Sequence, residues 1–148
     1  MYFMWPFLQA LIATLPPMAY VIFLWLMLAV VFALLGMALF GDLLFRCSSG
    51  AEYPEGKAEC SGYQSESSVG ILLPRAWYSP SYNFDSFPTA LLTLFRITFV
   101  KYIDIMRDAM DISWKDTSPM QMNSPHHSLY FVVYILLSAY FIMNVFIA

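Results

Sequence analysis

The chain has 148 residues, of which 60% are hydrophobic and 18% aromatic, and its mean hydropathy is +0.64. Only 11% of the residues are charged, whereas a soluble domain carries about 25%. The net charge of −3 and the lack of a basic run exclude a surface that follows nucleic-acid phosphates. The composition is therefore that of a membrane protein.

All charged residues lie in the middle of the chain, between Asp42 and Asp116. Residues 1–41 and 117–148 contain no Asp, Glu, Lys or Arg. This distribution predicts two membrane-spanning helices joined by a long polar connection. The sequence carries no P-loop, dinucleotide or zinc-protease motif, and it offers no nucleophile–base or metal constellation that would favour an enzyme.

The first hydrophobic end is divided by Pro16 and Pro17. A proline disfavours helical geometry in the residue before it, so we expect residues 1–17 to form an interfacial linker. The first transmembrane helix then covers residues 18–41, long enough to cross a hydrocarbon core of roughly 30 Å. Gly36 and Ala38 either permit close helix contact there or are small residues that lipid tolerates.

Residues 42–82 form a polar connection with little expected regular structure, which we place outside the cell. A disulfide between Cys47 and Cys60 would contribute about 3 kcal/mol in an oxidising compartment; the alternative is two free thiols in a cytosolic loop. The positive-inside rule opposes an extracellular loop, because all seven Lys and Arg residues lie in the middle of the chain, but it weakens in loops beyond about 60 residues. The aromatic residues near its end suit either a membrane–water interface or packing against the next segment; they are Trp77, Tyr78 and Tyr82.

The stretch 83–111 is too short to cross a bilayer and return, since one crossing needs about 20 apolar residues. Asp85 or Ser86 is positioned to cap a first short helix, with Pro88 in its first turn. An apolar face follows at helical spacing, formed by Ala90, Leu91, Leu94 and Phe95. We expect a non-helical tip at residues 98–101 and a second short helix, which together make a re-entrant hairpin. Irregular backbone at membrane depth requires burial in protein or contact with water, as in a pore.

Residues 129–148 contain no charged residue and are predicted to form the second transmembrane helix. This helix continues to the last residue, and we expect it to be truncated. Asn144 either faces neighbouring helices near the inner end of the span or makes a structural hydrogen bond between helices. The pair His126–His127, in the polar connection before this helix, is expected to be solvated at the interface, because two adjacent side chains do not converge on one metal ion.

Several segments resemble the pore module of the four-repeat voltage-gated calcium and sodium channels. LLGMALFGD is similar to the end of the fifth helix of one repeat, and RAWYSPSYNFDSFPTALLTLF to the approach and first pore helix. YIDIMRDAMD resembles the second pore helix, and FIMNVFIA the end of the sixth helix, with Asn144 at the family's asparagine position. The approach is most like a third repeat, including that of fungal calcium channels.

The resemblance implies an all-α membrane protein in which two transmembrane helices flank the re-entrant pore hairpin, one quarter of a pseudotetrameric pore. It also implies a cation-conducting function in the plasma membrane, with membrane lipid as surroundings. The partners would be three further pore repeats or subunits and a voltage-sensor domain. No cofactor is implied, only permeant Ca²⁺ or Na⁺. The alternative function is a non-conducting or accessory membrane protein derived from such a repeat.

The resemblance assigns the selectivity filter to Thr98, Phe99, Val100 and Lys101. The family commonly has a Glu or Asp within a pattern like T-x-E-G-W, and this chain is one residue shorter there. Either Val100 or Lys101 takes the filter position, and neither is a carboxylate. A carboxylate attracts divalent cations strongly while a lysine repels them, so Lys101 would favour sodium; alternatively its side chain is solvated at the mouth. Asp104, the nearest acid, would carry a charge of the outer vestibule.

Overall fold

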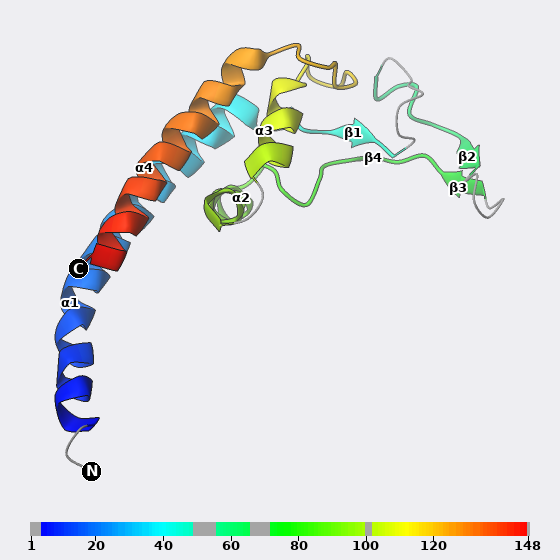
Figure 1. The fold of residues 1–148 in the computed structure, drawn as a ribbon. Helices are drawn as coiled ribbons and strands as arrows, with labels where there is room; N and C mark the ends of the chain where they lie inside the picture. The colour runs from blue at the N-terminus through cyan, green and yellow to red at the C-terminus, as the bar shows by residue number, and fades with distance from the viewer. Residues whose placement is uncertain (1–3, 49–55, 66–71, 100–101, 148) are drawn as a thin grey trace.

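The computed structural model describes residues 4–48, 56–65, 72–99 and 102–147. Two long helices, α1 (Met4–Phe40) and α4 (Ser128–Ile147), lie side by side and run in opposite directions, and α1 extends beyond the end of α4 (Figure 1). Each includes a stretch long and apolar enough to cross a membrane. The shorter helices α2 (Phe87–Phe99) and α3 (Tyr102–Met110) lie on one side of this pair (Figure 1).

Helix α1 is continuous and contains Pro16 and Pro17 in its interior. The expected break between an interfacial linker, 1–17, and a separate span, 18–41, is therefore wrong. A proline removes one backbone donor and crowds the carbonyl four residues earlier. Leaving the helix at this point would leave further backbone groups without partners in an apolar segment, which is more unfavourable. The helix ends instead at Phe40, and Asp42 follows with a left-handed φ of 60°.

The polar connection contains more regular structure than expected. Strand β1 (Arg46–Cys47) pairs antiparallel with β4 (Trp77–Tyr78), and β2 (Tyr63–Ser65) pairs antiparallel with β3 (Leu72–Pro74). These strands have only two or three residues each, so the protein remains predominantly helical. A short 3₁₀ helix, η1 (Pro125–His127), leads into α4.

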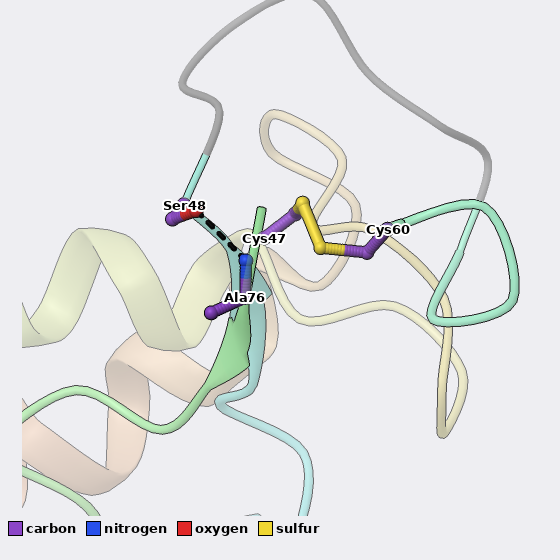
Figure 2. The surroundings of a disulfide bond; sticks show 4 residues. All are labelled: Cys47, Ser48, Cys60 and Ala76. Atoms are coloured by element: carbon purple, nitrogen blue, oxygen red, sulfur yellow. Dashed lines mark hydrogen bonds between the residues drawn. A yellow bond between two sulfur atoms is a disulfide. The ribbon is translucent and has the colours of Figure 1, made fainter. Parts of the chain in front are cut away.

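The expected disulfide is confirmed. Figure 2 shows the bond between Cys47 of β1 and Cys60 in the loop before β2, whose Cα atoms are 5.8 Å apart. Beside it, the backbone N–H of Ala76 donates to Ser48 Oγ at 3.0 Å (Figure 2). The bridge therefore joins the loop to the β1–β4 pair.

Helix α2 begins after Ser86, whose carbonyl accepts the first helical hydrogen bond from Ala90 N. Asp85, the other expected cap, instead accepts hydrogen bonds from Asp42 N at 2.9 Å and from Ser79 Oγ at 2.8 Å. The buried face is rotated from the predicted one, and consists of Ala90, Thr93, Leu94 and Ile97. Phe95 remains 51% exposed, whereas Thr93 is buried, and its hydroxyl is satisfied by donating to Asn83 O at 3.1 Å.

The core lies where the end of α1, the start of α4, the segment before α2 and the buried faces of α2 and α3 meet. Phe40 packs against Phe84 and Phe131 at ring-centroid distances of 5.3 Å and 5.4 Å. At Gly36, an added Cβ would lie 2.6 Å from ring atoms of Phe84 and from Tyr130 Oη. Gly36 thus permits the close contact anticipated in the sequence, whereas Ala38 is exposed. This core holds the approach to α2 against both long helices.

Candidate functional site

The site predicted from the sequence lies where α2 ends and α3 begins. Thr98 and Phe99 are the last two residues of α2, so the expected non-helical tip does not include them. Val100 and Lys101 lie outside the described residues. The end of a helix carries unpaired carbonyl oxygens and a partial negative charge, so the C-terminus of α2 is an environment that favours cations.

Asp104 lies in the first turn of α3 and is exposed. A carboxylate stabilises a helix at this position, because the N-terminus of a helix carries a partial positive charge. The side chain is therefore available to solvent on the helix that follows the tip. It is the only acidic residue in the first turn of either α2 or α3.

Helix α4 contacts the last turn of α2 through a buried tyrosine. Tyr134 Oη lies 3.0 Å from Thr98 Oγ1 and 3.4 Å from the carbonyl oxygen of Leu94. Thr98 Oγ1 in turn donates to Leu94 O at 3.0 Å. Tyr134 was not predicted from the sequence. The one signal for it is a hydroxyl inside a hydrophobic span, because such a group must find a partner where water is absent.

Helix α1 packs against another part of the same turn. The indole ring of Trp25 makes edge-on contacts with Phe95 and Phe99, with centroids 6.1 Å and 6.3 Å apart. The two phenylalanine rings also contact each other at 4.7 Å. The last turn of α2 is therefore held by side chains from both long helices.

A polar network holds the other end of α3. Arg46 Nη1 pairs with Asp108 Oδ2 at 3.1 Å, and Tyr82 Oη donates to the same oxygen at 2.5 Å. Arg46 Nη2 donates to Tyr82 Oη at 3.2 Å, and the guanidinium carbon lies 5.9 Å from the centre of the Tyr78 ring. The sequence did not predict this network, although it allowed Tyr78 and Tyr82 to pack against the hairpin.

Partial burial and hydrogen bonding alter the acidity of two of these groups. Burial raises the pKa of Tyr82, and the hydrogen bond to Asp108 raises it further. Burial lowers the pKa of Arg46, but its hydrogen bond with Tyr82 and the charge of Asp108 outweigh this effect, and the net direction is upward. Arg46 is therefore charged and Tyr82 neutral at physiological pH.

The remaining predicted residues lie apart from the tip. Asn144 is half-buried on α4, about 15 Å along the helix axis from Tyr134. His126 is exposed, as expected, but His127 is half-buried, with Nδ1 3.0 Å from Ala109 O and its ring against Phe40. No group of three or more His, Cys, Asp or Glu residues that could hold a metal ion occurs in the part of the chain that the structure describes.

Comparison with known proteins identifies the family. Residues 4–148 match the family model described as ion transport protein. The chain belongs to the ion transport protein family. This membership and the two candidate spans identify a multi-pass integral membrane protein with a predominantly helical fold.

The similar proteins carry the names of calcium channels, not of enzymes. The chain is 33% identical over 123 residues to the calcium-channel protein cch1 of Schizosaccharomyces pombe, covering 82% of this chain and 7% of that protein. It is 30% identical over 127 residues to the voltage-dependent L-type calcium channel subunit alpha-1C of Cavia porcellus, covering 82% of this chain and 6% of the relative. The alpha-1S subunit of Rattus norvegicus is 30% identical over 127 residues, with 82% and 7% covered. This ion transport protein thus spans less than a tenth of the length of the curated relatives that it matches.

Proposed function

We propose that this chain is the pore-forming unit of a voltage-gated-type cation channel that conducts calcium or sodium across a membrane. The observation that carries the proposal is the position of the end of α2, which Tyr134 and Trp25 hold against both candidate spans. Membership of the ion transport protein family and the calcium-channel relatives support it.

In this proposal, residues 83–111 form a re-entrant pore hairpin that enters and leaves on the same side of the membrane. Contacts at both ends of the hairpin support this topology. Before α2, Asp85 accepts a hydrogen bond from Asp42, just after α1 ends, and near the end of α3 Asp108 pairs with Arg46. Both ends are thus bound to residues 42–46.

The depth at which the C-terminus of α2 lies relative to the end of α1 supports a pore. Thr98 contacts Tyr134, whose ring packs against Phe32 at 5.2 Å. Phe32 lies about 12 Å along the helix axis from Phe40, the last residue of α1. Helix α2 is too short to cross the hydrocarbon core, so its C-terminus lies within the membrane in this topology.

We assign the selectivity filter to Thr98, Phe99, Val100 and Lys101, and a charge of the outer vestibule to Asp104. Val100 or Lys101 occupies the filter position itself, and a lysine there favours monovalent over divalent cations. Asn144 is assigned to the inner part of the sixth helix of the repeat. The repeat is most like a third one.

Two spans and one hairpin do not enclose a conduction path, so the pore requires three further repeats or subunits. We also propose that the channel contains a voltage-sensor domain and lies in the plasma membrane. The test is to express the complete protein that contains this chain and to record cation currents under voltage steps. We expect a cation current from it and none from residues 1–148 alone in a lipid bilayer.

The second candidate is a non-conducting or accessory protein derived from such a repeat. The absence of a carboxylate among Thr98 to Lys101 favours it, because the ion-binding group of a calcium filter is then missing from this repeat. A complete protein that reaches the surface and carries no current would support this second function over the first.

A further inference from the structure

The hydroxyl groups of Thr98 and Tyr134 form a directed chain of hydrogen bonds between α4 and α2. Thr98 Oγ1 donates its one proton to Leu94 O at 3.0 Å. Tyr134 Oη therefore supplies the proton, which two acceptors of α2 share: Thr98 Oγ1 at 3.0 Å and Leu94 O at 3.4 Å. Tyr134 is fully buried and Thr98 is half-buried. Tyr134 is thus the donor that joins the inner helix to the last turn of α2.

The surroundings of this chain leave little competition from water. Leu94 and Ile97 of α2 are buried, and Tyr134 packs against Phe32 of α1. A hydrogen bond in such surroundings is stronger than one in water, and a polar group that loses its partner there is destabilised. Tyr134 therefore anchors the last turn of α2, because its hydroxyl reaches both Thr98 Oγ1 and Leu94 O.

We propose that Tyr134 is a positioning residue for ion selection, which holds Thr98 and Phe99 in place through the Thr98 hydroxyl. The inference rests on the proposed channel function. Because Tyr134 lies on α4, a movement of α4 acts directly on the turn of α2 that ends in Phe99. The bond therefore couples the inner helix to the filter side of the pore.

Ser138 provides a matched control on the same helix. It lies one turn after Tyr134 and is 1% exposed, and its hydroxyl interacts with no described residue of α2; its side-chain neighbour is the Tyr134 hydroxyl. Replacing Tyr134 by Phe and Ser138 by Ala each removes one buried hydroxyl from the same face of α4. Only the first replacement removes a contact with α2.

The experiment compares these variants in the complete channel, with reversal potentials measured under bi-ionic calcium and sodium conditions and surface expression measured in parallel. We expect Tyr134→Phe to change the permeability ratio by about threefold or more, the size expected from the loss of one neutral hydrogen bond. Ser138→Ala should leave the ratio unchanged. Thr98→Val, which removes the hydroxyl that Tyr134 contacts, should change it. The double variant Tyr134→Phe/Thr98→Val should differ no more than the larger single change.

An unchanged ratio in Tyr134→Phe, or additive effects in the double variant, would overturn this inference and leave the channel function standing. If Tyr134→Phe does not reach the surface, Thr98→Val decides, and an unchanged ratio in that variant would overturn the inference. Absence of cation current from the unmodified complete protein would overturn the proposed function and this inference together.

Discussion

Arg46 and Asp108 form an ion pair, with 3.1 Å between Nη1 and Oδ2, that joins the connection after α1 to the last turns of α3. Tyr82 bonds both partners, so the pair belongs to a three-residue network. The two charged side chains are 34% and 27% exposed, which weakens the pair through solvent screening. The network holds the last turns of α3 against the connection between α1 and α2.

Replacement of Asp108 by Asn is expected to lower the free energy of unfolding by about 1 kcal/mol, because a partly exposed ion pair contributes little more. Thermal unfolding of the purified protein in detergent measures the loss. The control is a double-mutant cycle with Arg46→Gln, in which the double variant should lose less than the sum of the two single losses. Additive losses would show that the Arg46 pair does not stabilise the protein.

Stability is expected to fall at alkaline pH through Tyr82. Its pKa is raised above the ordinary value of 10.0 in the folded protein. The stabilisation that it provides is therefore complete below that value and is lost as the pH rises through the folded-state pKa. Unfolding measured between neutral and alkaline pH should show a smaller loss in Tyr82→Phe than in the unmodified protein. Identical pH profiles would exclude Tyr82 as the responsible group.

Gly36→Ala is expected to destabilise the core by about 1 to 3 kcal/mol, the usual effect of overpacking. The added Cβ would lie 2.6 Å from Phe84 and from Tyr130 Oη, so at least one of these must move. Ala38→Val is the control, because Ala38 is exposed two residues away. Thermal unfolding compares the two, and a Gly36→Ala variant as stable as the control would contradict the close packing seen here.

We expect a reductant that cannot cross the membrane to reduce the Cys47–Cys60 bridge from outside the cell. Intact cells are treated with a membrane-impermeant reductant and then with an impermeant maleimide, and the peptides containing the two cysteines are identified by mass spectrometry. We expect labelling only after reduction, because both cysteines are joined. Labelling that requires permeabilised cells would place residues 42–82 on the cytosolic side. The double variant Cys47→Ser/Cys60→Ser controls for other cysteines and should lose about 3 kcal/mol of stability.

Lys101→Glu in the complete channel is expected to raise calcium permeability relative to sodium, because a carboxylate attracts divalent ions and the lysine repels them. Reversal potentials under bi-ionic conditions measure the change. Lys101→Arg keeps the charge and should keep the ratio. If the ratio is the same in Lys101→Glu, Lys101 does not belong to the filter and is solvated at the mouth.

Several parts of the fold could be predicted because their signals are local. The charge-free ends mark the candidate spans by composition, and Ser86 followed by Pro88 marks the start of α2. The disulfide could be predicted because the chain has only two cysteines. The break at Pro16–Pro17 was predicted wrongly, because a local preference against helix was outweighed by the backbone hydrogen bonds on either side.

The amino-acid sequence by itself determined the membrane class, the candidate spans and the two short helices between them, since these depend on composition and on neighbouring residues. Tertiary structure alone decided which side chains meet. Thr98 and Tyr134 are separated by 36 positions and Arg46 and Asp108 by 62, and no local pattern specifies such pairs. They form because packing at Gly36, Phe40 and Phe84 brings α1, α4 and the approach to α2 together, and because buried polar groups then take the partners within reach.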